Sequence, residues 1–194
     1  IELFKEMAEE KEVRVPAERN GTHISGIEPL EITEDNQPVL IGETTNVLGS
    51  SQFKELINEE KYEQAAEMGR EQVRAGAQVL DVCMQDPDRE EIRDMEKFLD
   101  ILIKKVKVPL VLDSTDAEVL ERGLMFCQGK AVINSINLED GEDRFEEVVP
   151  LLKRYGASVV VGCIDEDPEM GMAVSLERKM EVADRSIDLL TNKY

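Results

Sequence analysis

The fold is decided by two short apolar runs, Val79-Leu80-Asp81-Val82 and Leu110-Val111-Leu112, and by the segment between them. Runs this short and this apolar are typical of strands buried on both faces of a parallel sheet. Between them, apolar residues recur three or four positions apart, as on one face of a helix: Ile92, Met95, Leu99, Leu102 and Val106. The stretch therefore predicts a strand–helix–strand unit with a right-handed crossover.

The same alternation extends outward in both directions. Three further runs have the composition of buried strands: Val39-Leu40-Ile41, Ala131-Val132-Ile133 and Ser158-Val159-Val160-Val161. Two further stripes are predicted to face a core: Phe145, Val148, Val149, Leu152 and Tyr155, and then Met180, Ala183, Ile187 and Leu190. Thr115 and Glu118 have the form of a capping box. Gly76, Gly129 and Gly156 precede strands, where a helix end favours a residue tolerant of positive φ.

This alternation predicts an α/β protein, with two architectures in competition. An open doubly wound sheet expects a GxGxxG loop after its first strand, and the segment from Gly42 to Ser50 lacks that spacing. A full barrel needs eight units and roughly 250 residues. We therefore expect the N-terminal portion of a (β/α)8 TIM barrel, with about five βα units, over residues 38–194. Residues 1–37 are expected to be a linker or N-terminal arm, with a helix pattern at 1–11 and irregular chain over 12–37.

Composition excludes several functional classes. The chain has 194 residues and a formal net charge of −20, from 43 acidic and 23 basic residues. Such a charge opposes binding to nucleic acid. The sequence shows no apolar run long enough for a membrane span and no signal-peptide pattern, so a cytoplasmic protein is expected. The three cysteines, Cys83, Cys127 and Cys163, are expected to be buried thiols. With His23 as the single histidine, expected to be a solvated loop residue, no metal site is predicted.

Polar residues follow the predicted strands. Asp81 lies in the second run, and Asp113, Asn134 and Asp165 follow the next three. Glu43 and Asn46 follow the first. The carboxyl ends of parallel strands open onto one face, where barrel active sites lie. Carboxylates and amides there suit a heterocycle that carries N–H donors and ring acceptors. The same residue types also form turns and helix caps, so spacing alone leaves both readings open.

Five motifs, taken in order, resemble the pterin-binding barrel of cobalamin-dependent methionine synthases. The first, Val39-Leu-Ile-Gly-Glu-Thr-Thr-Asn-Val-Leu-Gly-Ser50, is similar to the opening GERTN-type segment of that family. The others are Gly76-Ala-Gln-Val-Leu-Asp-Val82, Val111-Leu-Asp-Ser-Thr115, Gln128-Gly-Lys-Ala-Val-Ile-Asn-Ser-Ile136 and Tyr155-Gly-Ala-Ser-Val-Val-Val161. The resemblance covers roughly residues 25–194. The wider group includes corrinoid-protein methyltransferases and, more distantly, dihydropteroate synthase.

The resemblance implies a methyltransferase module in methionine biosynthesis. It would bind 5-methyltetrahydrofolate and present the N5-methyl group to cob(I)alamin carried by a partner domain or corrinoid protein. By motif, the substrate-binding residues are Glu43, Asn46, Asp81, Asp113 and Asn134. Ser114 and Ser135 would shape loops. The residue that contacts N5 is expected beyond Tyr194, in strands that would follow.

Two departures and two alternatives accompany this hypothesis. Thr44 stands where the family has arginine, and Cys83 stands where asparagine is common. One alternative is a pterin enzyme like dihydropteroate synthase, which needs a site for a diphosphate leaving group. The other is a truncated, non-catalytic fragment that self-associates through open sheet edges, as a homodimer for example.

Overall fold

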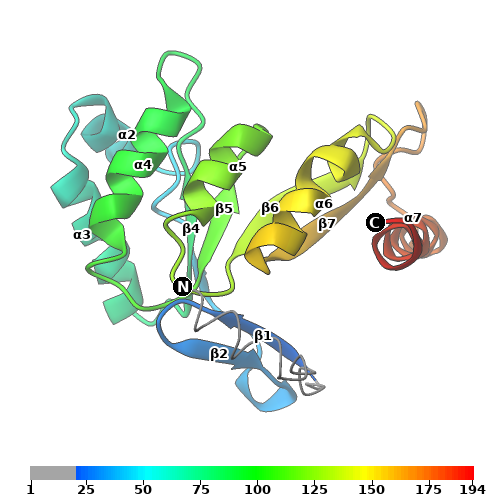
Figure 1. The fold of residues 1–194 in the computed structure, drawn as a ribbon, viewed down its shortest axis with the longest axis horizontal. Coiled ribbons are helices and arrows are strands. Elements are labelled where there is room, and N and C mark those ends of the chain that lie inside the picture. The colour runs from blue at the N-terminus through cyan, green and yellow to red at the C-terminus, as the bar shows by residue number, and fades with distance from the viewer. Residues whose placement is uncertain (1–20) are drawn as a thin grey trace, which may run out of the picture.

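The structure, a computed structural model, describes residues 21–194. Its centre is a parallel sheet of five strands in the order β3-β4-β5-β6-β7, so each strand lies beside its predecessor in the chain (Figure 1). A doubly wound sheet instead reverses its strand order at a switch point. Consecutive order is that of successive βα units in a barrel. The predicted α/β fold, a partial TIM barrel, is confirmed.

The elements follow the predicted alternation. The strands are β3 (Ile41–Gly42), β4 (Val79–Cys83), β5 (Leu110–Asp113), β6 (Val132–Leu138) and β7 (Ser158–Asp165). The helices are α2 (Ser51–Asn58), α3 (Tyr62–Arg74), α4 (Glu91–Leu102), α5 (Ala117–Leu124), α6 (Asp143–Tyr155) and α7 (Leu176–Asp188), with a short η2 helix (Leu189–Lys193) at the end. Each of the five predicted strand runs overlaps one strand of the sheet.

The main core lies between the sheet and the helices. Leu80, Leu112 and Ile133 point from the strands to this side and are fully buried. They meet large side chains from the helices, among them Phe53 and Phe98, whose rings pack edge to face with centroids 5.2 Å apart. Because strand side chains alternate between faces, the residues between them point to the other side of the sheet.

A β-hairpin covers the end of the sheet where the strands begin. It consists of β1 (Thr22–Ser25) and β2 (Pro29–Ile32), which pair in antiparallel fashion (Figure 1). Ile24 on β1 is buried against Val79 and Val111, which stand on the inner face of the sheet. The hairpin thus closes the base of the partial barrel with an apolar contact.

Main-chain contacts fix the hairpin to the loops beneath the sheet. The N–H of Ser25 donates to the carbonyl of Lys130 at 3.0 Å, and the N–H of Glu28 donates to the carbonyl of Lys107 at 3.1 Å. The backbones approach so closely that a Cβ on Gly129 would lie 2.4 Å from the carbonyl oxygen of Gly26. Glycine at 129 is therefore required by the close approach of two chain segments.

The structure corrects two predictions for the N-terminal region. The chain expected to be irregular over residues 12–37 contains the regular hairpin from Thr22 to Ile32. His23 lies in β1 and not in a loop; it is half-buried, with Nε2 4.0 Å from a carboxylate oxygen of Glu31. The helix expected at residues 1–11 lies outside the described residues, and the domain boundary near residue 38 stays a prediction.

Two predictions about helix ends also change. The cap of α5 is Asp116, not Thr115: its carboxylate accepts the backbone N–H two residues later at 2.8 Å. Gly76 and Gly156 have φ of 111° and 66°, as expected. Gly129 does not have a positive φ. Glycine is needed at this position because a side chain would clash with the backbone of Gly26.

The stripe predicted to face the core on α7 and η2 is only partly buried: Ala183 is half-buried and Leu190 packs against the core, but the other two residues face solvent. Met180 and Ile187 are 54% and 58% exposed, whereas Val182 and Ser186 are buried. Helix α7 packs on β7, an edge strand among the described residues, so only a narrow side of the helix is covered. The period of the helix was predicted correctly, but its most deeply buried residues, Val182 and Ser186, lie outside the predicted stripe.

Candidate functional site

The carboxyl ends of the first four strands of the parallel sheet bring the five predicted site residues together. Parallel pairing aligns Cys83 with Asp113, and Asp113 with Asn134. Asp81 stands two residues before Cys83 and therefore points to the same inner face. The remaining two follow β3, giving the set Glu43, Asn46, Asp81, Asp113 and Asn134.

Asn46 links the two aspartates. Its Nδ2 donates to Oδ2 of Asp81 at 2.9 Å and makes a longer contact of 3.4 Å with Oδ2 of Asp113. Its Oδ1 accepts the backbone N–H groups of Leu48 and Gly49, at 2.8 and 3.1 Å. One buried amide thus holds two carboxylates side by side and fixes the loop that follows β3.

Burial changes the acidity of both carboxyl groups. Desolvation raises the pKa of Asp81 to about 6; the bond from Asn46 lowers it, and the charges of Asp113 and Glu43 raise it. Desolvation also raises the pKa of Asp113 above its usual range, with the same opposing bond from Asn46. A buried and a half-buried acid in this condition favour a ligand that brings hydrogen-bond donors or positive charge.

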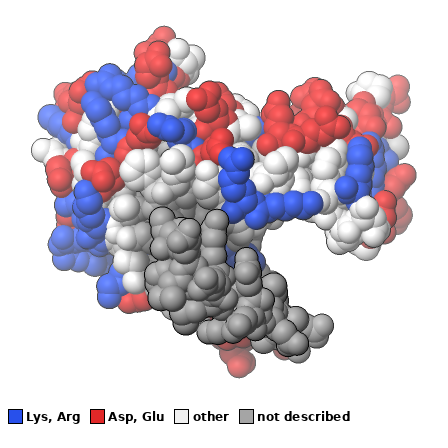
Figure 2. All heavy atoms as spheres, viewed as in Figure 1, with Lys and Arg blue, Asp and Glu red and all other residues white. Residues whose placement is uncertain are grey.

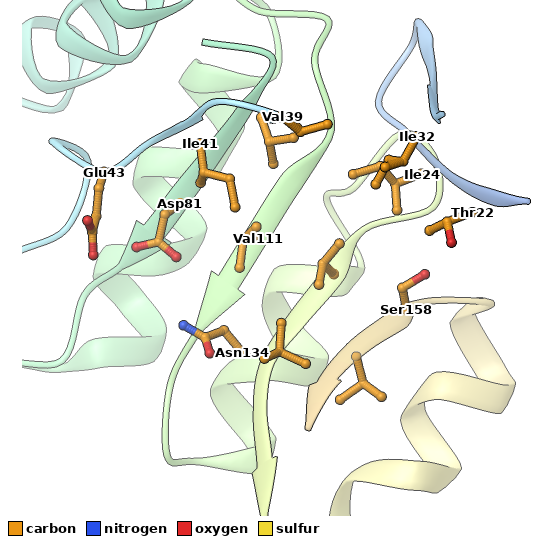
Figure 3. A pocket seen from close by; sticks show the side chains of 14 residues that line it. Thr22, Ile24, Ile32, Val39, Ile41, Glu43, Asp81, Val111, Asn134 and Ser158 are labelled. Atoms are coloured by element: carbon orange, nitrogen blue, oxygen red, sulfur yellow. The ribbon is translucent and has the colours of Figure 1, made fainter. Parts of the chain in front are cut away.

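A cavity of about 450 Å³ opens below this cluster, on the inner face of the sheet. Figure 3 shows Glu43, Asp81 and Asn134 on the same side of the sheet, with Val111 between the last two. Toward the hairpin the lining is mainly apolar, with Thr22 and Ser158 as polar exceptions; the apolar residues are Ile24, Ile32, Val39, Ile41, Val79, Val111 and Val132. The cavity therefore has an apolar body and a polar mouth, the usual form of a small-molecule site.

A second, polar hollow of about 250 Å³ adjoins the mouth: Asn134 lines both hollows, whereas Asp113 lines only this second one. Arg144 from α6 lines it and donates to the carbonyls of Ser114 and Thr115, both at 2.8 Å. These bonds join α6 to the loop after β5. Arg144 thereby supports the position of Asp113 from outside the cavity.

The other predicted positions have structural surroundings. Asp165 lies at the end of β7 and forms an ion pair with Arg178, away from the cavity. Ser114 is buried, and its Oγ accepts the N–H of Asp116 at 3.1 Å, so it shapes the loop as expected. The peptide bond between Asn134 and Ser135 is cis.

The two departures from the family motifs differ in environment. Thr44 is exposed, and its N–H donates to the side-chain oxygen of Gln72 at 2.9 Å. Cys83 is fully buried, and burial raises the pKa of its thiol to about 12. Cys127 and Cys163 are half-buried, and all three thiols are free. At neutral pH Cys83 is a packing residue.

Sequence reasoning missed two residues that support the site, Gln72 and Arg144. Gln72 lies on a polar helix, and Arg144 follows a series of acidic residues. Neither stands in a motif, because each acts on a loop that is distant in the sequence. Only the contact between elements reveals them.

The face that carries the site is acidic. Figure 2 shows Asp and Glu side chains gathered along the upper edge, above the ends of the strands. The exposed acids of the loops there include Asp88, Asp116, Glu139, Asp140, Glu166 and Glu169. Within residues 21–194, no three His, Cys, Asp or Glu side chains are grouped to hold a metal ion. None of the helices in this range is both long and apolar enough to cross a membrane.

Fold and site together define the class of protein: a barrel-type α/β domain with a polar cluster and a cavity at the carboxyl ends of its strands, where ligand sites of this architecture lie. The comparison with known families is more specific. Residues 42–194 match the family described as pterin binding enzyme, and the chain belongs to that family.

Proposed function

We propose that this domain binds 5-methyltetrahydrofolate and presents its N5-methyl group to cob(I)alamin, as a module of a cobalamin-dependent methionine synthase. The observation that supports the proposal is the cluster in which Asn46 holds Asp81 and Asp113 together beside Asn134. Membership of the pterin-binding enzyme family supports the ligand class, and the ordered motifs support the methyltransferase.

The chemistry of the cluster fits a pterin. Its ring and exocyclic amino group carry adjacent N–H donors, and a carboxylate accepts two such donors side by side. Asp113 is assigned to this edge of the ring, and Asn134 both donates and accepts. Glu43 lines the mouth of the cavity, and Asn46 lies behind it and holds Asp81 and Asp113. The apolar cavity wall, formed here by Val111 and Val132, covers the face of the heterocycle.

These residues would hold the pterin in one orientation for methyl transfer. Cobalamin, when bound by a partner, supplies a Co(I) nucleophile that accepts the methyl group. N5 is then a poor leaving group and needs a proton or a strong hydrogen bond. The acidic mouth stabilises positive charge at the ring. We assign no residue of this chain as the proton donor.

We propose two partners, each from a different observation. The acidic upper face is the side from which a corrinoid-carrying domain reaches the mouth (Figure 2). Separately, β3 and β7 are the edge strands of the parallel sheet among the described residues, and Leu40, Ile41 and Val160 are exposed there. A second copy of the chain would cover these edges as a homodimer. The free thiols agree with a cytoplasmic compartment.

Calorimetric titration with 5-methyltetrahydrofolate tests the ligand, together with the molar mass in solution. We expect saturable binding, and a loss of affinity of about thirtyfold in Asp113→Asn because a charge-assisted pair is removed. Asp100→Asn is the matched control, since Asp100 is exposed on α4 and pairs with Lys104. Equal affinity in Asp113→Asn and its parent would refute the pterin assignment.

A second assay separates methyl transfer from the chemistry of dihydropteroate synthase. That alternative needs cations for a diphosphate, and Arg144 is the one cationic side chain that lines the two hollows among the described residues. Its guanidinium already donates to carbonyl groups. We expect no condensation of a pterin diphosphate with p-aminobenzoate. Product formation would favour the alternative.

A further inference from the structure

Gln72 on α3 reaches the loop that carries Glu43. Its Oε1 accepts the N–H of Thr44 at 2.9 Å, directly after Glu43 in the chain. Helix α3 packs on the outer side of the sheet, whereas Glu43 lines the cavity on the inner side. This hydrogen bond thus connects the helical layer with the mouth of the site.

Gly42 provides the space for this contact. A Cβ at position 42 would lie 2.6 Å from Oε1 of Gln72 and 3.0 Å from a methyl group of Leu80. The backbone of β3 therefore passes directly beneath the glutamine amide. The contact between Gln72 and Gly42 therefore fixes the position of the backbone, relative to α3, at the point where β3 leads into Glu43.

The same loop is held from its other side by β4. Thr45 Oγ1 donates to the carbonyl of Asp81, and the N–H of Cys83 donates to the carbonyl of Thr45 at 3.2 Å. The Glu43 carboxylate accepts no hydrogen bond from another residue within the described range. Its position is therefore determined by the backbone, which Gln72 and β4 hold on either side.

The amide of Gln72 is not explained by packing. Its Nε2 is buried and has no partner among residues 21–194. A buried donor without an acceptor is unfavourable, and a hydrocarbon side chain of similar length would fill the space without that penalty. The feature that only an amide or acid supplies is the oxygen that accepts the Thr44 N–H.

We propose that Gln72 is a positioning residue for the ligand site: by holding Thr44 it aims the carboxylate of Glu43 at the cavity beside Asp81. The ligand part of this inference rests on the proposed function. The loop part does not, because the charge of Glu43 also raises the pKa of Asp81 in the free protein.

The chain contains a matched control at the other end of the same strand. Gln78 Oε1 accepts the N–H of Leu40 at 3.1 Å, just before β3 and away from the polar mouth. Gln72→Met and Gln78→Met remove the same kind of acceptor from the two ends of one strand. A general loss of stability would affect both variants; loss of positioning affects only the first.

The experiment combines three readouts on the full chain. For Gln72→Met we expect faster hydrogen exchange at Thr44, a lower pKa of Asp81 by NMR titration, and affinity for 5-methyltetrahydrofolate reduced about tenfold, as for one lost hydrogen bond. Gln78→Met should leave all three at parent values. In a Glu43→Gln background, Gln72→Met should change the affinity less than twofold, because its effect passes through Glu43.

Two results would overturn the proposal. One is an affinity loss that is the same in the Glu43→Gln background as in the parent. The other is a Gln72→Met variant whose Thr44 exchange and Asp81 pKa both equal those of the parent. If the parent chain does not bind 5-methyltetrahydrofolate, the proposed function fails, and these two ligand-free measurements still decide the role of Gln72.

Discussion

The two ends of the parallel sheet differ in what holds them together. At the base, the hairpin meets the sheet through apolar packing of Ile24 and main-chain contacts around Gly129. At the mouth, Asn46 holds two carboxyl groups whose pKa burial raises. The comparison teaches that the base is held by packing and main-chain contacts, whereas the mouth is held by hydrogen bonds to titratable groups at the end of the strands where barrel enzymes place their ligands.

The largest expected loss of stability comes from removing the hydrogen bonds of Asn46 at the mouth. Asn46→Leu keeps the volume of the side chain but removes the donor to Asp81 and the acceptor for two backbone N–H groups. The free energy of unfolding at pH 7 should fall by about 2–4 kcal/mol, because hydrogen bonds to charged groups are among the stronger ones. Denaturant titration measures this.

Asn137→Leu is the control for that change. Asn137 is half-buried on β6, and its Oδ1 accepts one backbone N–H, that of Glu139 at 3.0 Å. It has no carboxylate partner in the described structure, so its loss should be smaller. Equal losses in the two variants would show that the Asn46 cluster has no special contribution to stability.

A substitution that disturbs the contact between hairpin and sheet at the base should give the next largest loss of stability. A methyl group on Gly129 would meet the backbone of Gly26, which has little freedom to move. Gly129→Ala should lower the free energy of unfolding by about 2–3 kcal/mol, in the upper part of the range for overpacking. The pKa of Asp81 should stay unchanged. A shifted Asp81 pKa would mean that the two ends are coupled.

The contribution of the mouth to the free energy of unfolding should also depend on pH, whereas that of the base should not. Because the pKa of Asp81 is raised to about 6 in the folded state, the folded protein binds this proton more tightly than the unfolded chain does. The stabilisation of the folded state by this proton is complete below about pH 4 and is lost as the pH rises through 6. The free energy of unfolding should fall by an amount on the order of 1–3 kcal/mol over this range.

Asp81→Asn isolates this contribution. The variant lacks the titrating group but can still accept the bond from Asn46. From pH 4 to pH 7 the parent loses the stabilisation by the Asp81 proton, and the variant has no such proton to lose. The free energy of unfolding of the variant should therefore rise relative to that of the parent over this range. A difference that is constant across this range would contradict the raised pKa.

Helix α7, outside both ends, should give the smallest effect. Ile187 is 58% exposed, so Ile187→Ala should change the free energy of unfolding by about 0.5 kcal/mol or less. Val182 is buried on the same helix, and Val182→Ala should cost about 1–2 kcal/mol. Similar losses for both would mean that the apolar stripe of α7 is covered in solution.

The sequence predicts the strands and the strand-end residues well for a physical reason. A buried parallel strand must be a short apolar run, and its carboxyl end must open onto the shared face, so Asp113 and Asn134 could be placed together from their positions alone. Asn46 was predicted as a site residue. Its bonds to both aspartates were not, since pairing at 35 and 67 residues of separation leaves no periodic trace.

Features that depend on contacts between elements were not predictable. The helical period of α7 is visible in the sequence, but which side is buried depends on the neighbours of β7. The hairpin at Thr22–Ile32 was hidden by frequent turn residues. Gln72 and Arg144 resemble any solvated side chain, and only their distant partners distinguish them.

The strand order also has a consequence for how the chain folds during synthesis. Each strand of the sheet pairs with the strand made just before it, so the edge that receives a new βα unit already exists when that unit leaves the ribosome. The hairpin is the exception. Ser25 is bonded to Lys130, 105 residues later, so the hairpin, although made before the sheet, can close the base only after the chain has reached the start of β6, the fourth strand of the sheet.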